Sequence, residues 1–226
     1  MSIEISNVSK VYNTLGKRHT VLKNFNLTIE RGVNWGIIGR NGAGKTTLLK
    51  LITGSLQPDT GYIRRNMSVS WPLGYGGSLS PELTGRVNCR FIARLYGRSP
   101  EEVTRYAADW AELGHFIDWP VKTYSSGMRS RLSFALSMAV DFDCCLIDEG
   151  TSAGDARFRA KTQETLQERR AKSSLVMASH NLREVVNLCD RLVVLGGPQP
   201  EITDDVERRV KQYAQELTGS ASGMDF

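Results

Sequence analysis

A glycine-rich segment at 39–46 constrains the fold of this chain more than any other feature. Its sequence, GRNGAGKT, follows the phosphate-binding loop pattern G-x-x-x-x-G-K-[ST]. An apolar, strand-like run over 33–38 precedes it, and a helical pattern over 47–53 follows it. A chance glycine-rich turn would rarely have this strand before it and this helix after it. The segment therefore predicts an α/β fold that binds a nucleoside triphosphate.

Each residue type in this loop has a physical role. Gly39, Gly42 and Gly44 let the backbone approach anionic oxygens closely, and the amides that open the following helix point at phosphates. Lys45 is expected to reach the β- and γ-phosphates, and Thr46 is expected to bind Mg²⁺. The remaining expected contacts with the nucleotide come from Asn41, Ala43 and Thr47.

Composition narrows the class of protein. A chain of 226 residues fits one α/β domain, or a core with a smaller appended lobe. Its four cysteines show no C-x-x-C spacing, which favours reduced core thiols over metal ligands and indicates a reducing compartment. No signal peptide and no apolar run of about eighteen residues is present, so a soluble or peripheral protein is expected. The net charge of +5 is scattered without interleaved aromatics, which favours a solvated surface and argues against nucleic acid as a partner.

The chain divides into a core and an inserted lobe. Strand-like runs up to residue 38 predict an antiparallel sheet that leads into the phosphate loop, and 67–71 reads as a strand that ends at Pro72. The region 74–126 is helical in pattern, with helices at 86–97 and 100–113, and is predicted to be a separate lobe. The chain then returns to the core, with a predicted helix at 127–140 and strands at 142–147 and 174–178. The core is expected to span 1–73 and 127–200 and to contain a mostly parallel sheet. A C-terminal helix and loose tail are expected over 201–226.

Two adjacent acids follow the apolar strand at 142–147. In a magnesium-dependent triphosphatase, the first carboxylate can hold the metal through water while the second faces the attacking water. Asp148 and Glu149 fit these two roles. Solvated acids at a strand end are the alternative on this segment alone, and the phosphate loop makes that alternative the weaker one.

Three further sites have a structural explanation as well as a functional one. Ser125, Ser126 and Gly127 precede a helix and offer donors for a second phosphate site, although an ordinary serine N-cap is the better explanation of this segment on its own. His180 follows an apolar strand, where ligands meet parallel sheets. Tyr12 could stack on a base, or it could be core or surface filler.

Taken in order, these motifs resemble the nucleotide-binding subunit of the ABC transporter family, from Tyr12 to about Leu195. The resemblance implies a P-loop ATPase with an N-terminal antiparallel β-subdomain and an inserted helical subdomain. It further implies a head-to-tail homodimer in which the loop and Asp148 of one subunit hold Mg-ATP while Ser125 to Gly127 of the other cover the γ-phosphate. By the same resemblance, Glu149 is the general base, His180 senses the γ-phosphate, and Tyr12 stacks on adenine.

Two departures from the family pattern point to one branch. The usual Leu-Ser-Gly-Gly-Gln signature is replaced by YSSGM at 124–128, and WPLG at 71–74 stands where the family has a glutamine. Both departures resemble the ATP-binding subunits of capsular-polysaccharide exporters of the KpsT type, with O-antigen and teichoic-acid exporters as relatives. Some O-antigen exporters have an additional C-terminal carbohydrate-binding domain, for which this chain is too short, so the capsule branch is favoured.

The resemblance also implies partners and a location. A motor of this kind docks on a separate integral-membrane permease at the cytoplasmic face of the inner membrane, through the segment 73–94, and need not touch the polysaccharide. A non-transport ABC ATPase that acts on nucleic acid is the alternative, but such proteins usually carry a coiled-coil insertion or a second ATPase domain. A P-loop kinase would not need the motif at 125–127 or the adjacent acids Asp148 and Glu149.

Overall fold

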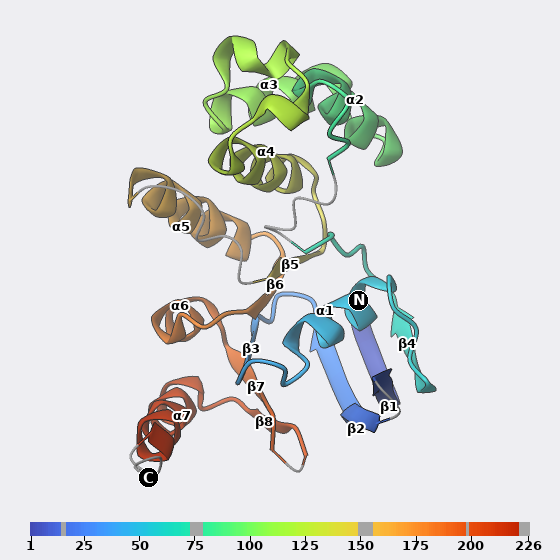
Figure 1. The fold of residues 1–226 in the computed structure, drawn as a ribbon, viewed down its shortest axis with the longest axis vertical. Coiled ribbons are helices and arrows are strands. Elements are labelled where there is room, and N and C mark those ends of the chain that lie inside the picture. Colours follow the sequence, from blue (N-terminus) through green and yellow to red (C-terminus); the bar gives the residue numbers. More distant parts are fainter. Residues whose placement is uncertain (15–16, 73–78, 149–155, 198, 222–226) are drawn as a thin grey trace. The chain divides into compact units, whose positions relative to one another are not determined.

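The computed structural model describes residues 1–14, 17–72, 79–148, 156–197 and 199–221 (Figure 1). The chain forms two compact units, one made of residues 1–67 and 174–226 and the other of residues 68–173. The first unit contains two sheets and the phosphate loop. The second contains most of the helices. None of the helices in the described ranges is long and apolar enough to cross a membrane.

The first sheet of the first unit is antiparallel, with strand order β2-β1-β4. Its strands are β1 (Ser2–Thr14), β2 (Lys17–Glu30) and β4 (Thr60–Arg65). Phe25, Leu27 and Ile29 alternate with exposed residues along β2, which is the pattern of a strand with one buried face. The expected N-terminal antiparallel sheet is therefore present.

The strand before the phosphate loop belongs to a different sheet. β3 (Trp35–Gly39) pairs in parallel with β6 (Ser174–Ala178) and β7 (Arg191–Leu195), and β8 (Glu201–Thr203) runs antiparallel to β7. All residues of β3 and β6 are buried, as expected for strands covered on both faces. A continuous apolar run, rather than alternation, therefore distinguishes β3 from the antiparallel strands that precede it.

A buried asparagine aligns these strands. Asn34 donates from its backbone and side-chain nitrogens to Asp190 at 2.9 and 2.8 Å, and its side-chain oxygen accepts from the Leu175 amide at 2.9 Å. It thus links the start of β3 to the starts of both neighbours. Because parallel strands that start together also end together, the ends of β3 and β6 meet at the edge where the phosphate loop lies.

Three helices complete the first unit: α1 (Lys45–Thr53), α6 (Leu182–Leu188) and α7 (Val206–Ala221). α1 ends at Gly54 in a left-handed conformation, with φ of 83°. Arg65 on β4 donates to the carbonyls of Leu51 and Ile52 at 2.5 and 2.7 Å, so a side chain joins the Gly54 amide in satisfying the acceptors of the last turn. α7 packs on α6, which places the predicted C-terminal helix in the first unit.

In the second unit, α2 (Gly85–Leu95), α3 (Pro100–Trp110) and α4 (Ser126–Ala139) pack on one another. Two short 3₁₀ segments (Gly114–Asp118 and Val121–Thr123) lead into α4, and β5 (Cys144–Asp148) and α5 (Ala156–Arg170) follow it. Thr84, Ser99 and Ser125 are the side-chain N-caps of α2, α3 and α4. Trp110 joins α3 to α4 through Phe134, at 4.7 Å between ring centroids, and to α5 through a 3.0 Å hydrogen bond to Thr165.

This second unit extends beyond the lobe expected at 74–126, because α4 and α5 pack with the inserted helices. The division into core and helical subdomain at residues 74 and 126 remains a prediction.

The strand predicted at 67–71 is wrong in extent: only a single bridge pairs Val69 with Cys144. Ser68 donates its hydroxyl to Asp143 at 2.8 Å, and Ser70 accepts from the Leu146 amide at 2.9 Å. The backbones of Ser68 and Ser70 bond to Cys144, but the Leu146 amide then bonds to the Ser70 side chain where a regular ladder would continue through the backbone.

Candidate nucleotide-binding site

The phosphate loop connects the end of β3 to the start of α1. Gly42 and Gly44 have φ of 80° and 102°, in the left-handed region that favours glycine. Gly44 is the N-cap of α1 and has no side chain to occupy the first-turn amides. The positive end of the helix dipole therefore faces the concave side of the loop, which is the arrangement that binds phosphate.

Close packing also requires glycine in this loop. A Cβ atom on Gly39 would lie 2.7 Å from the Leu195 carbonyl oxygen on β7, and one on Gly44 would collide with the Val21 side chain on β2. Val21 is a contact that sequence reasoning did not find, because no local motif marks it.

The side chain of Lys45 lies against the backbone of the phosphate loop. The side chain is only 6% exposed, and its ammonium donates to the carbonyls of Gly39 and Arg40 at 2.7 and 3.4 Å. The positive charge is thus held beside the backbone of the loop rather than in bulk water. This cation and the first amides of α1 lie on the same side of the loop, where both could contact a bound triphosphate.

Tyr12 lies beside the first turn of α1. Its hydroxyl lies 3.4 Å from the Thr47 hydroxyl, and the residue is 38% exposed. Asp59 holds this end of β1, since it accepts from the Lys10 ammonium and the Val11 amide, both at 2.7 Å. The Lys10 hydrogen bond, and then that of the Val11 amide, keep the pKa of Asp59 below its usual value. The exposed ring is therefore fixed next to the loop, where a planar base could stack on it.

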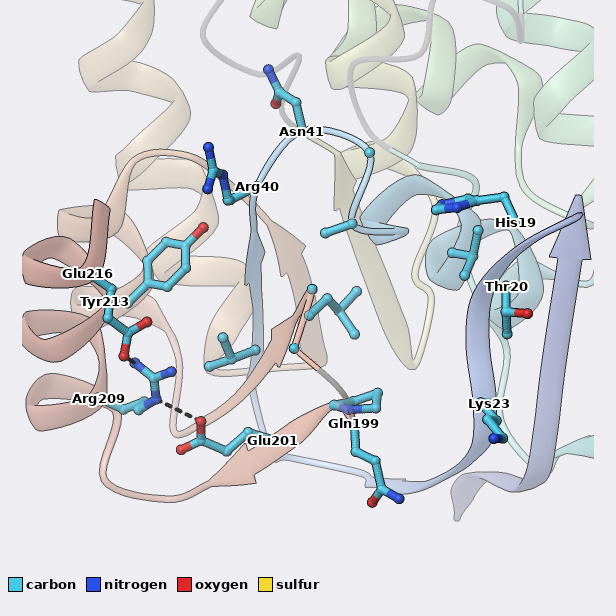
Figure 2. Close-up of a pocket in the computed structure, with 18 residues that line it drawn as sticks. His19, Thr20, Lys23, Arg40, Asn41, Gln199, Glu201, Arg209, Tyr213 and Glu216 are labelled. Atoms are coloured by element: carbon cyan, nitrogen blue, oxygen red, sulfur yellow. Dashed lines mark hydrogen bonds and ion pairs between the residues drawn. The ribbon is translucent and has the colours of Figure 1, made fainter. Parts of the chain in front are cut away.

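A pocket of about 640 Å³ lies beside residues 40–43 of the phosphate loop (Figure 2). Its walls come from the loop at Arg40 to Ala43, from β2 around His19 to Lys23, and from β7, β8 and α7. Arg209 on α7 forms an ion pair with Glu201 at 2.8 Å, which ties the helix to β8. It forms a second ion pair with Glu216 on its own helix at 3.2 Å. The volume falls within the range of small-molecule sites.

His180 follows β6 and lies near the loop, as predicted. It lines a second pocket, of about 390 Å³, together with Gly39, Arg40, Asn41 and Tyr213. Figure 2 shows the Tyr213 hydroxyl pointing toward Arg40. Burial raises the pKa of Tyr213, and the nearby Arg40 charge acts in the opposite direction. Sequence reasoning missed Tyr213, because only the tertiary packing of α7 brings it to the loop.

The second unit contains the other predicted site residues. Ser125 is the N-cap of α4, and its hydroxyl accepts from the Met128 amide at 3.1 Å, which is the structural role that the sequence left open. Ser126 is exposed, and a Cβ on Gly127 would meet only Ser125, at 3.8 Å. A role of these three residues in phosphate binding stays a prediction.

Asp148 ends β5 and is 9% exposed, whereas Glu149 lies outside the described residues. Among the residues that the structure describes, no group of three or more His, Cys, Asp or Glu side chains could hold a metal ion. Mg²⁺ in nucleotide sites uses one or two protein oxygens together with phosphate oxygens, so such a group is not needed. The exposed Thr46 hydroxyl and the Asp148 carboxylate are oxygen donors of the kind that Mg²⁺ prefers.

Comparison with known proteins identifies the class. The profile of the ABC transporter family matches residues 22–152, and the chain belongs to this family of ATP-binding proteins. The chain is 43% identical to the capsule polysaccharide export ATP-binding protein CtrD of Neisseria meningitidis serogroup B, over 93% of this chain and 98% of the relative. It is also 47% identical to the polysialic acid transport ATP-binding protein KpsT of Escherichia coli, over 85% and 87% of the two chains. The dimeric structure of the ATP-binding cassette MJ0796 bound to ADP and Pi has the same fold, with a TM-score of 0.76 and 21% identity over 88% of this chain and 97% of that one.

Proposed function

We propose that this protein is the ATP-hydrolysing motor of an ABC exporter that drives lipid-linked capsular polysaccharide across the cytoplasmic membrane. The observation that carries the proposal is the similarity to capsule polysaccharide and polysialic acid export proteins over most of the chain. The geometry of the phosphate loop supports the nucleotide chemistry, because the loop presents a buried lysine and an N-terminal helix turn to one site.

The residues of this site have distinct proposed roles. Lys45 and the amides of α1 bind the β- and γ-phosphates, and Tyr12 stacks on adenine. Thr46 and Asp148 hold Mg²⁺, which when bound neutralises developing negative charge on the phosphates. Glu149 accepts a proton from the attacking water. His180 contacts the γ-phosphate, which its position in the pocket beside Gly39 and Asn41 supports.

The active unit is proposed to be a head-to-tail homodimer that forms when ATP binds. In it, Ser125, Ser126 and Gly127 of one subunit cover the γ-phosphate held by the other. Ser125 and Ser126 are exposed at the start of α4, so their polar groups are accessible to a second subunit. Closure excludes water from the phosphates and strengthens the electrostatic contacts there. Hydrolysis removes the shared γ-phosphate contact and reopens the dimer.

The motor is proposed to act from the cytoplasmic face of the inner membrane, bound to an integral-membrane permease. The segment 73–94 is the proposed permease contact, and its residues 73–78 lie outside the described residues. No direct contact with the polysaccharide is needed, because the motor transmits work through the permease. Nucleic acid is not a proposed partner.

Surface polysaccharide in a strain that depends on this protein tests the proposal. With Glu149→Gln or Lys45→Ala as the sole copy, polymer should accumulate inside the cytoplasmic membrane and be absent from the surface. The exposed substitution Arg183→Gln on α6 serves as a control and should export normally. Normal surface polymer with Glu149→Gln and Lys45→Ala would show that this ATPase moves another cargo.

A further inference from the structure

Tyr124 comes directly before the three residues proposed to cover the γ-phosphate of a second subunit, Ser125 to Gly127, which we name the covering motif. Tyr124 is only 4% exposed, whereas Ser125 and Ser126 are exposed. Its hydroxyl donates to the Phe116 carbonyl at 2.5 Å. Because Ser125 is the N-cap of α4, this bond fixes the chain one residue before the helix that presents the covering motif.

The start of α2 packs directly on the same hydroxyl. A Cβ atom on Gly85, the first residue of α2, would collide with the Tyr124 hydroxyl and lie 3.1 Å from the Ile117 carbonyl oxygen. Gly85 does not have a positive φ, so the backbone conformation does not require glycine here. Glycine is otherwise unfavourable in a helix. The residue therefore provides the room that the Tyr124 hydroxyl occupies.

Backbone pairing holds the segment before α4 against the segment before α2. An antiparallel bridge pairs Thr84 with Pro120, and the Val121 amide donates to the Leu83 carbonyl at 2.9 Å. The second 3₁₀ segment then leads to Tyr124, whose amide donates to the Val121 carbonyl at 3.0 Å. The bond of the Tyr124 hydroxyl thus closes the end of a paired region that leads into the covering motif.

The Tyr124 hydroxyl remains a donor under ordinary conditions. Burial raises the pKa of Tyr124 to about 12, so the hydroxyl keeps its proton throughout the neutral range. The Phe116 carbonyl also accepts from the Trp119 amide at 2.9 Å, so the acceptor is itself fixed in a turn. Donor and acceptor are therefore both held in place before any second subunit arrives.

We propose that Tyr124 is a positioning residue for the ATP-bound dimer, because its hydroxyl holds the covering motif in place in the free subunit. The inference rests on the proposed function, in which this motif covers the γ-phosphate of the other subunit. A motif that is ordered in advance loses less conformational entropy when the dimer forms. Loss of the hydroxyl should weaken the dimer and leave ATP binding unchanged, since the phosphate loop belongs to the first unit and Tyr124 to the second.

Dimerisation of the Glu149→Gln protein in saturating Mg-ATP, followed by analytical ultracentrifugation over a range of protein concentrations, tests this inference. Adding Tyr124→Phe, which keeps the ring, should raise the dimer dissociation constant about tenfold, the value of about one hydrogen bond. The affinity for ATP at dilute protein should not change. With Glu149 intact, Tyr124→Phe should lower the ATPase rate at low protein concentration, and a higher concentration should restore it. A folding defect would lower the rate at every concentration.

The control is Tyr62→Phe, which removes a tyrosine hydroxyl from an exposed position on β4 and should dimerise like the parent. Gly85→Ala displaces the Tyr124 hydroxyl from the other side and should weaken the dimer as Tyr124→Phe does.

Equal dimer dissociation constants with and without Tyr124→Phe would overturn the inference alone and leave the proposed function intact. A tenfold loss of ATP affinity at dilute protein would also overturn it, because the hydroxyl would then support the fold and not the covering motif. If Glu149→Gln alone formed no dimer with ATP, the proposed function would fail, and the role of Tyr124 would fail with it.

Discussion

At the scale of single residues, the phosphate loop depends on glycines for two different reasons. Gly42 needs only its left-handed backbone, since a Cβ there would meet nothing within 4 Å. Gly44 has both a φ of 102° and the Val21 side chain where its Cβ would lie. Gly97, with a φ of 64° and open space around it, isolates the backbone effect alone.

We expect Gly97→Ala to lower the free energy of unfolding by about 1 kcal/mol, the cost of a left-handed non-glycine residue. Gly44→Ala should cost about 2–4 kcal/mol, because the collision with Val21 adds to that backbone cost. Adding Val21→Ala should recover part of the difference. Urea unfolding measures all three variants, and equal losses at Gly44 and Gly97 would contradict the role given to Val21.

Tyr12 offers a second test at this scale. Tyr12→Ala should raise the KM for ATP about tenfold and leave kcat nearly unchanged, because a stacked base contributes about 1–3 kcal/mol. Tyr12→Phe keeps the ring and should behave like the parent, since the 3.4 Å contact with Thr47 is long for a hydroxyl pair. Steady-state kinetics decides this, and a similar KM in the alanine and phenylalanine variants would rule out stacking.

The cysteines provide a test of burial. All four are buried, and burial raises the pKa of the Cys89 thiol to about 12 and that of Cys144 as well. Only the thiolate reacts with iodoacetamide, and a raised pKa leaves little thiolate at pH 8. Mass spectrometry should therefore detect no alkylation of the native protein within minutes and four additions in denaturant. Rapid labelling of the native protein at Cys89 or Cys144 would contradict this burial.

At the scale of elements, α1 is the helix on which the site depends, and a side chain from another element closes its C-terminal end. Arg65 on β4 reaches the carbonyls of Leu51 and Ile52, and partial burial lowers the pKa of its guanidinium. Hydrogen bonds from a charged group contribute more than neutral ones. The cap therefore holds the far end of the helix whose first turn is the proposed phosphate site.

Arg65→Ala should lower the free energy of unfolding by about 1.5–3 kcal/mol. Arg64→Ala is the matched control, because Arg64 is exposed and its contact with Glu4, at 3.9 Å, is a surface pair worth little. Chemical denaturation should separate the two variants clearly. Indistinguishable stabilities would remove Arg65 from its capping role.

Elements with strong local patterns could be predicted from the sequence. The apolar run before the glycine loop and the helical period after it gave β3 and α1, and Ser99-Pro100 marked the start of α3. The strand expected at 67–71 is reduced to one bridge because the Leu146 amide bonds to the Ser70 side chain and not to its backbone, which alternation does not reveal. A pattern of apolar and polar residues does not show whether a polar residue will form its hydrogen bonds through its backbone or through its side chain.

At the scale of the whole molecule, the two units carry different parts of the proposed nucleotide chemistry. The phosphate loop, Tyr12 and His180 belong to the first unit, and Asp148 and Ser125 to the second. The sequence could single out each of these residues as a candidate, although the roles expected for Tyr12 and His180 rest on the family resemblance and not on spacing. It could not find Val21 or Tyr213, which reach the loop only through the packing of β2 and α7.

The most direct test uses purified Glu149→Gln protein with Mg-ATP. Analytical ultracentrifugation should show a stable dimer with bound ATP and no turnover, because binding is retained and the general base is lost. Lys45→Ala should remain monomeric under the same conditions, since it no longer binds the phosphates. Full ATP turnover by Glu149→Gln, or ATP binding by Lys45→Ala at the parent affinity, would contradict the proposed ATP-driven motor.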